Sequence, residues 1–214
     1  MKALFKPASG TSTSKNSIGG AAWVPEGTQV PVCRCCGAVL QLFVQFDVQR
    51  QFALPFREGS HFVLSLCPKC NEIPMFDTYA GQQLPARYWE KNVGNHHAAL
   101  YRPTDAWAPA PGVDLLRAFD LVFTEQAPAS ESFQIGGEPC WVQEAEHFTC
   151  SCGAEMRLLL QIPENHPFPK LESAPEQPDS FSSDDYCAFL GNEVYVFACE
   201  KQCDERAVWI TVQN

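Results

Sequence analysis

The sequence has few basic residues for its length. Lysine and arginine total 15, against 25 aspartate and glutamate residues, which gives a formal net charge of −10. Nonspecific nucleic-acid binding draws its affinity from lysine and arginine on phosphate, so this balance argues against that function. A net negative charge fits either an ordinary acidic surface or a basic protein partner.

Long hydrophobic runs are also lacking. No stretch of 18 uncharged apolar residues occurs, which argues against a membrane-spanning helix. Residues 1–7 lack the apolar core of a signal peptide, and residues 9–17 are small and polar. We therefore predict a cytoplasmic protein whose residues 1–17 form a flexible leader.

The familiar catalytic motifs are missing as well. Gly-x-Ser-x-Gly, a phosphate-binding glycine loop and His-Glu-x-x-His do not occur. His96 and His97 stand without an acid or nucleophile at a recognisable spacing, so we interpret them as packing or surface histidines. An enzyme whose site is assembled across the fold stays open as an alternative, and residues 87–107 are where we would look for it.

What the sequence does contain is a repeat. The segment 18–46 returns as 135–162, and each copy begins with Ile-Gly-Gly. A cysteine stands 14 residues after the first of these glycines in both copies, and a later Cys-Gly pair is followed at equal spacing by a glutamine, Gln45 or Gln161. Each copy closes with an apolar run that ends in two cysteines. Matches at fixed offsets indicate an internal duplication.

The repeat sorts eight of the 11 cysteines into two sets of four. In each set, two pairs lie beside a glycine or after an apolar run, which is the arrangement of a four-thiolate zinc site. The predicted ligands are Cys33, Cys36, Cys67 and Cys70 in the first copy, and Cys150, Cys152, Cys199 and Cys203 in the second. Four thiolates leave no open position for water or substrate, so we expect one or two structural zinc ions.

Two other interpretations of these cysteines stay open. One or both sets have lost their metal and hold free or disulfide-bonded cysteines, or one pair is a catalytic redox pair. The redox interpretation is disfavoured because neither pair of the first copy opens a helix, the setting that lowers a thioredoxin-type pKa. Cys35, Cys140 and Cys187 are left over, and we predict that they are small buried residues.

The expected fold class is mainly β, or α+β with little helix. Short apolar runs bounded by glycine, proline or cysteine predict strands at residues 39–46, 62–66, 116–123, 156–162, 194–198 and 207–212. Seventeen prolines cut the chain too often for long helices, and the best helix candidate is the weak one at residues 82–92.

We predict one globular domain built from two duplicated antiparallel β units with cysteine knuckles. The first unit spans residues 18–70 and the second 134–214, and a connecting segment at 71–133 joins them. Because each unit is small, we expect the two to be related by a pseudo-twofold axis and to share one core.

Two segments are candidate partner-binding surfaces. The second copy carries an acidic, proline-rich insertion near residues 163–185, and a long polar loop is usually functional or disordered, so a contact surface and an idle flexible loop both stay open. The connecting segment is dense in aromatic residues, which anchor interfaces but more commonly lie in the core. The candidate contact residues are Glu172, Glu176, Asp179, Asp184 and Asp185 in the insertion, and Tyr88, Trp89 and Trp107 in the connecting segment.

The order of these motifs resembles that of a known family. Residues 136–141 read Gly-Gly-Glu-Pro-Cys-Trp, residues 150–153 read Cys-Ser-Cys-Gly, Gln161 ends an apolar run, and residues 195–199 read Tyr-Val-Phe-Ala-Cys. This order resembles the bacterial YwqG-like family of uncharacterised proteins, and the resemblance covers both copies. It implies a binding protein, and relatives of this family include immunity proteins that neutralise toxins of bacterial competition systems. A similar order in the eukaryotic programmed cell death protein 2 family implies a chaperone of ribosomal proteins.

We predict a non-enzymatic protein that binds a protein partner. The first hypothesis is an immunity protein that neutralises a cognate basic toxin, such as a nuclease, by direct binding. An acidic inhibitor associates rapidly with a basic nuclease and covers the surface that its substrate needs. The alternatives are a zinc-stabilised chaperone or adaptor for a basic client such as a ribosomal protein, and an uncharacterised enzyme. We expect neither nucleic acid nor a membrane as partner.

Overall fold

The computed structural model describes residues 2–7, 14–29, 31–70, 72–74, 79, 81–91, 94–110, 112–124, 133–178, 180 and 182–214. Its elements are β1 (Lys2–Pro7), β2 (Ser17–Ile18), β3 (Trp23–Pro25), β4 (Gln41–Asp47), η1 (Arg50–Phe52), β5 (His61–Leu66), α1 (Tyr88–Lys91), β6 (His96–Tyr101), β7 (Trp107–Pro109), β8 (Phe119–Thr124), β9 (Gln134–Ile135), β10 (Met156–Ile162), β11 (Phe168–Pro169), β12 (Asp185–Tyr186), η2 (Ala188–Gly191), β13 (Glu193–Cys199) and β14 (Val208–Gln213).

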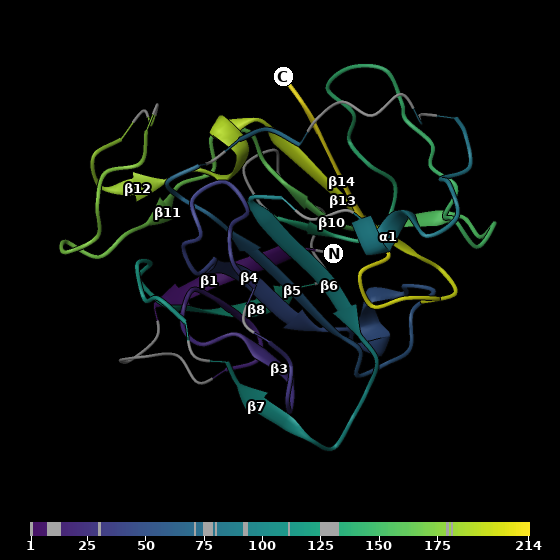
Figure 1. The fold of residues 1–214 in the computed structure, drawn as a ribbon, viewed down its shortest axis with the longest axis horizontal. Helices are drawn as coiled ribbons and strands as arrows, with labels where there is room; N and C mark the ends of the chain where they lie inside the picture. Colours follow the sequence, from purple (N-terminus) through teal and green to yellow (C-terminus); the bar gives the residue numbers. More distant parts are fainter. Residues whose placement is uncertain are drawn as a thin grey trace.

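The fold is mainly β with little helix, as the sequence predicted (Figure 1). Ten strands form one antiparallel sheet in the order β14-β13-β10-β9-β1-β8-β2-β4-β5-β6. Two further pairs, β11–β12 and β3–β7, form small antiparallel sheets of their own. Among the described residues, no helix is long and apolar enough to cross a membrane.

The strand order is symmetric about its centre. On one side of the β1–β8 pair lie β2, β4, β5 and β6, and on the other side lie β9, β10, β13 and β14 in the same sequence of pairings. The long strands of both halves have a bulge at the same place, with Phe43 and Leu159 as the extra residues. In each half the backbone N–H of the first repeat glycine donates to the carbonyl of that bulge residue, at 3.3 Å for Gly19 and 3.2 Å for Gly136. The two copies of the repeat therefore have the same local structure.

The repeated glutamines hold the segment that follows each Gly-Gly pair. The Gln45 Oε1 atom accepts from the Trp23 backbone N–H at 2.8 Å, and its Nε2 atom donates to the Ala21 carbonyl at 2.9 Å. Gln161 makes the equivalent pair of bonds with the backbone of Cys140, at 3.0 and 3.1 Å. Both amides are buried, so these bonds satisfy groups that would otherwise cost free energy on burial. This need explains why a glutamine ends each apolar run.

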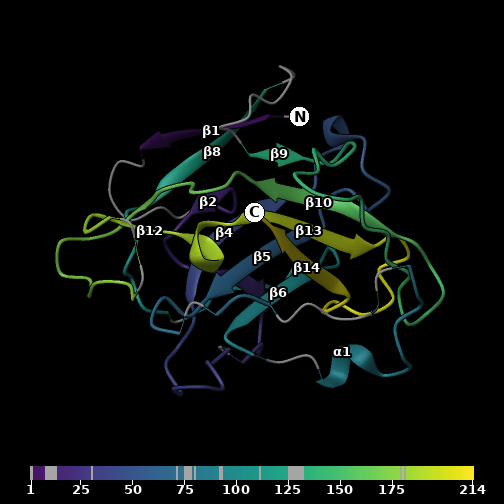
Figure 2. The same ribbon diagram turned by 90° about the horizontal axis from the view of Figure 1, so that it is seen from above.

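The sheet curls until its two edge strands, β6 and β14, meet (Figure 2). The backbone N–H of Leu100 in β6 donates to the carbonyl of Glu205, just before β14, at 2.8 Å. One hydrophobic cluster contains residues from the strands of both halves, among them Phe43, Leu64, Leu160 and Val196. The two copies thus share one core.

Two sequence-based boundaries need correction. Residues 2–7 of the predicted leader form β1, which pairs with β8 along its whole length; residues 1 and 8–13 of the leader lie outside the described residues. The segment 71–133 was predicted as a connection, but it supplies β6, β7 and β8, and β6 is the fourth strand of the first half. The prediction missed β6 because no motif shared by the two copies marks this strand. The predicted helix at 82–92 shrinks to α1, since Pro85 precedes it.

The insertion of the second copy, which we call the acidic lobe (residues 163–187), is attached to the core. Its backbone bonds to the strand-like segment before β8, with Arg117 N–H donating to Pro169 and Leu171 N–H to Leu115 at 2.8 and 2.9 Å. The Phe168 side chain is 0% exposed, and its ring lies 4.9 Å from Phe43 of the first half, centroid to centroid. The described part of the lobe is therefore not an idle flexible loop.

We expect Phe168→Ala to lower the free energy of unfolding by about 3–5 kcal/mol, because it leaves a cavity where both halves meet. Chemical denaturation measures this change. The control is Glu172→Ala, an exposed position in the same lobe, which we expect to change stability by less than about 0.5 kcal/mol. Similar values for the two variants would show that the lobe does not contribute to the core.

Candidate metal centres

The first cysteine pair of each copy lies in a tight turn before the long strand. In the first copy, the Cys33 N–H donates to Ala38 and the Gly37 N–H donates back to Cys33, both at 2.8 Å. Cys150 and Gly153 make the same bonds in the second copy, again at 2.8 Å. Gly37 has φ +72° and Gly153 has φ +81°, a conformation that residues with a Cβ rarely adopt. The Cys-Gly motif of the repeat therefore encodes this turn.

The second pair of each copy follows a buried strand. Cys67 comes directly after β5, and the Cys70 N–H donates to its carbonyl at 3.3 Å. Cys199 ends β13, and there the N–H of Gln202 makes the corresponding bond at 2.8 Å. Since β4 pairs with β5 and β10 with β13, the two turns of each copy meet at the same end of neighbouring strands.

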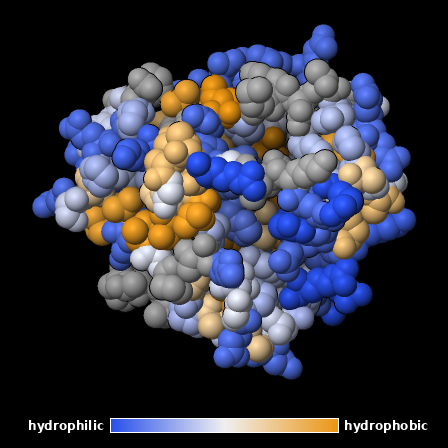
Figure 3. Space-filling model, in the orientation of Figure 1, coloured by the Kyte–Doolittle hydropathy of each residue, from blue (hydrophilic) through white to orange (hydrophobic). Residues whose placement is uncertain are grey.

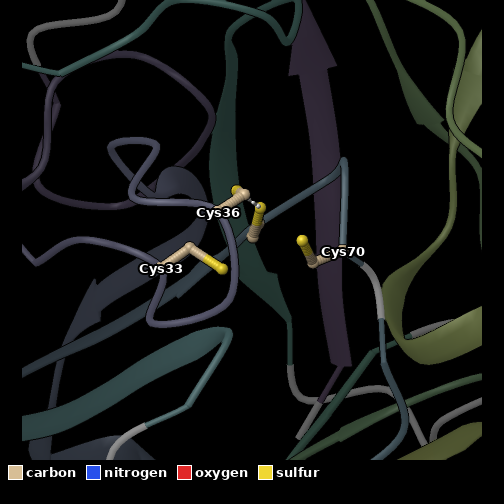
Figure 4. A group of neighbouring side chains, drawn as sticks. Cys33, Cys36 and Cys70 are labelled. Carbon is tan, nitrogen blue, oxygen red and sulfur yellow. Dashed lines mark hydrogen bonds between the residues drawn. The ribbon is translucent and has the colours of Figure 1, made fainter.

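All eight predicted ligands gather into two clusters, one in each half. In each cluster the four sulfur atoms lie within 4.8 Å of one another. Figure 4 shows Cys33, Cys36 and Cys70 gathered in one place. The Cys36 and Cys67 sulfurs are 3.6 Å apart. In the second cluster, Cys150 and Cys203 are 3.5 Å apart and Cys152 and Cys199 are 3.6 Å apart, sulfur to sulfur.

These distances fit metal coordination better than disulfide bonding. Four sulfurs at about 2.3 Å from a tetrahedral ion stand roughly 3.8 Å from one another, whereas the two sulfurs of a disulfide are about 2.05 Å apart. All eleven cysteines are free. In each cluster two sulfurs belong to buried residues and the others reach towards the surface. Each cluster could therefore hold one metal ion, with every position of a tetrahedron taken by the protein.

Close approach of the thiols separates their pKa values. A hydrogen bond from the backbone of Ala38 lowers the pKa of Cys36 to about 7, while burial raises the pKa of Cys67 to about 11. In the second cluster, the hydrogen bond from Cys199 lowers the pKa of Cys150 to about 4, and the same bond raises the pKa of Cys199. Each cluster thus has one sulfur that ionises more readily than an ordinary cysteine. Metal ions bind cysteine as thiolate, so this sulfur favours cation binding.

Trp89 was predicted on a partner-binding surface, and this prediction is wrong. Its side chain is only 3% exposed, and its indole Nε1 donates to the Cys150 sulfur at 3.4 Å. The short helix α1 brings it there, packed with Phe148 and Phe197. Hydrogen bonds to ligand sulfurs orient them and tune the metal, so Trp89 belongs to the second centre. Its aromatic neighbours in the sequence gave no sign of this role.

The other candidate contact residues have mixed positions. Tyr88 and Trp107 are half-buried; Tyr88 packs against Trp209, and Trp107 carries the Lys15 ammonium over its ring at 4.1 Å. In the acidic lobe, Glu172, Glu176 and Asp184 are exposed and Asp185 is half-buried, whereas Asp179 lies outside the described residues.

The leftover cysteines and the paired histidines differ in environment. Cys187 is buried as predicted, but Cys35 and Cys140 are exposed, and both lie outside the strands. His96 and His97 belong to β6, where burial lowers both pKa values to about 4. They are packing residues, as the sequence indicated, and stay neutral near pH 7.

Gln202 is a residue that sequence reasoning overlooked. It is one of the three residues between Cys199 and Cys203, where the first copy has only two between its cysteines. It adopts φ +46° and is 6% exposed. Its Oε1 accepts from the Arg57 N–H at 3.1 Å, its Nε2 donates to Ser60 Oγ at 2.9 Å, and its carbonyl accepts from the Arg102 side chain at 2.5 Å. The hydrogen bonds of Gln202 therefore connect the second cysteine cluster to the first half of the sheet.

Comparison with known proteins gives no further assignment. No protein-family model and no curated protein sequence matches this chain.

The two clusters predict two bound metal ions per chain. We expect Cys67→Ser and Cys199→Ser, each of which removes a buried sulfur, to lower the count to one ion, as measured by native mass spectrometry. The control is Cys35→Ala, an exposed neighbour of the first cluster, which keeps both ions. An unchanged metal content in the two serine variants would contradict coordination by these sulfurs.

We expect Gln202→Ala to lower the free energy of unfolding by about 1–3 kcal/mol, because the buried Ser60 hydroxyl loses its partner. Hydrogen exchange should accelerate at residues 57–60 and at Leu100, where the halves meet, while two metal ions remain bound. The matched control is Lys201→Ala, an exposed position in the same turn. Equal exchange rates in both variants would show that Gln202 does not fasten the halves.

Proposed function

We propose that this protein is a non-enzymatic binding protein for a basic protein partner, and that it serves as an immunity protein which neutralises a cognate toxin. The main observation in support of this proposal is the distribution of charged residues along the chain. Residues 134–214 contain fourteen acidic and four basic residues, whereas residues 1–133 contain eleven of each. The whole formal charge of −10 therefore belongs to the second copy, although the two copies share one architecture.

The acidic lobe concentrates part of this charge on the surface. Glu172, Glu176 and Asp184 are exposed. The lobe's single basic residue, Lys170, is only 9% exposed, and its Nζ donates to the Ala174 carbonyl at 3.1 Å. On the face seen in Figure 3, hydrophobic residues gather on the left, beside the lobe that carries β11 and β12. A negatively charged surface that is attached to the packed core increases the association rate of a basic partner and contributes to specificity.

We further propose that both cysteine clusters hold structural zinc in a cytoplasmic protein. Four-sulfur tetrahedral sites are typical of zinc or iron–sulfur centres, and zinc needs no open position or redox partner. A reducing compartment keeps cysteines in the thiol state that the clusters need. The resemblance of the repeat motifs to the YwqG-like family, whose relatives include immunity proteins, supports the choice of a toxin over other basic partners.

The test is affinity capture of the full-length protein from its own cells, with elution at high salt and identification by mass spectrometry. We expect one basic protein at one-to-one stoichiometry, and we expect the activity of that protein to be blocked by addition of the captured chain. The variant Glu172→Gln/Glu176→Gln/Asp184→Asn should bind about tenfold more weakly or worse, because it loses part of the acidic surface.

The matched control removes the same number of charges from residues 1–133. The exposed residues Glu26, Glu58 and Asp105 serve for this purpose, and Glu26→Gln/Glu58→Gln/Asp105→Asn should bind as the wild type does. Equal weakening in both variants would mean that net charge alone matters. Capture of an unfolded ribosomal protein in place of a toxin would favour the chaperone alternative, and failure to recover any basic protein under toxin-producing conditions would contradict the proposal.

A further inference from the structure

The acidic lobe has a cavity of about 330 Å³ that is partly open to solvent and lies beside β12 and the residue before η2. Asn165, Ser180, Ser182, Asp185, Tyr186 and Cys187 line it, together with one proline. Ligand pockets in proteins have volumes of roughly 300–1,000 Å³, so this one lies at the lower end and has room for a single long side chain. The sequence predicted partner-contact residues in this lobe but gave no indication of a cavity.

Most of the side-chain hydrogen-bond donors that line the cavity are already used within the lobe. Ser180 Oγ donates to the Ser182 carbonyl at 2.9 Å, and Ser182 Oγ donates to Asp185 Oδ2 at the same distance. The Tyr186 hydroxyl donates to the Pro175 carbonyl at 2.7 Å.

The side chains of two further lining residues donate within the lobe in the same way. Asn165 Nδ2 donates to Glu164 Oε1 at 3.0 Å, and the Cys187 thiol donates to Gln177 Oε1 at 3.6 Å. The Asn165 amide has two N–H donors, and the bond to Glu164 uses one of them. An anion that entered the cavity would nevertheless meet the Asp185 carboxylate. Phosphates and carboxylates are poor candidates for this reason.

The side-chain oxygens that line the cavity, in contrast, have lone pairs that these hydrogen bonds do not use. A carboxylate offers two oxygens with about four lone-pair sites, and one of the Asp185 oxygens accepts the bond from Ser182. The amide of Asn165 uses its nitrogen in the bond to Glu164, and its carbonyl oxygen is a further acceptor. The nearest candidate for an internal counter-ion, Lys170, directs its ammonium to the Ala174 carbonyl instead. The cavity thus suits a ligand that brings both positive charge and several donors.

We propose that this cavity binds the guanidinium group of an arginine side chain from the protein partner. Guanidinium is planar, keeps its charge, and presents five N–H donors in a fork that matches a carboxylate. The Asp185 carboxylate is the primary acceptor, and the Asn165 carbonyl and the serine oxygens supply secondary contacts. The inference rests on the proposed function for the identity of the partner, but the cavity's preference for guanidinium is a property of the lobe itself.

The test uses N-acetyl-L-arginine amide as the probe and follows backbone amide chemical shifts of the full-length, metal-loaded protein by NMR. We expect saturable shifts at Asn165, Tyr186 and Cys187. The citrulline analogue, which has the same shape without the charge, should bind about tenfold more weakly or worse, as should the arginine probe to Asp185→Asn, because both changes remove a charge-assisted hydrogen bond.

The neighbouring residue provides the matched control. Asp184 is exposed and does not line the cavity, so Asp184→Asn should bind the arginine probe within about twofold of the wild type, as expected for an exposed charge. A second variant, Ser182→Lys, keeps the carboxylate but places an ammonium beside it, and it should abolish binding by filling the cavity. Unchanged spectra of the core strands in each variant show that the fold is intact.

The outcomes separate this inference from the proposed function. Equal loss in Asp184→Asn and Asp185→Asn, or equal affinity for the citrulline analogue, would overturn the guanidinium site. If the arginine probe binds as expected but no basic partner is captured from cells, the cavity stands and the proposed function fails. If a toxin is captured and binds Asp185→Asn as tightly as the wild type, the partner docks elsewhere and the inference is overturned.

Discussion

The structure depends on the crowding of four cysteine sulfurs at one end of each half. Four sulfurs within 4.8 Å of one another match the ligand shell of a tetrahedral ion. That ion would close two loops at once, joining the turn before one long strand to the turn after its neighbour. Metal binding to such sites contributes about 10–16 kcal/mol in small zinc domains, comparable with the whole stability of a typical domain. An ion bound in each cluster would therefore hold both the turns and the strands they connect.

Duplication supplied a symmetric frame, and the departures from symmetry lie in its loops. Both halves keep the bulge, the buried glutamine and the cysteine turns. Only the second half carries the acidic lobe, and only its second cysteine turn has the additional residue that lets Gln202 reach the first half. Loops on a rigid scaffold change more freely than its strands, which is why the net negative charge and the cavity both belong to the second copy.

Charge acts over two distances in the proposed interaction. The excess of fourteen acidic over four basic residues in the second copy produces a field that raises the rate of encounter with a basic partner and weakens as salt increases. Within the cavity, hydrogen-bond geometry would decide instead, because the Asp185 carboxylate would favour a guanidinium over an anion or a neutral side chain. Affinity for a particular partner would need both effects, since a general negative field alone attracts any basic protein.

The sequence by itself determined the elements whose causes are local. Spacing of Cys, Gly and Gln revealed the duplication and both ligand sets, because a tight turn and a buried amide each demand particular residues at fixed positions. Apolar runs located six of the eight described strands that have six or seven residues, and they missed β1 and β6. Tertiary structure alone decided the rest: that β6 completes the first half, that Trp89 reaches the Cys150 sulfur, that Gln202 fastens the two halves, and that the lobe packs through Phe168. These depend on contacts between residues as many as 145 positions apart, which no local pattern records.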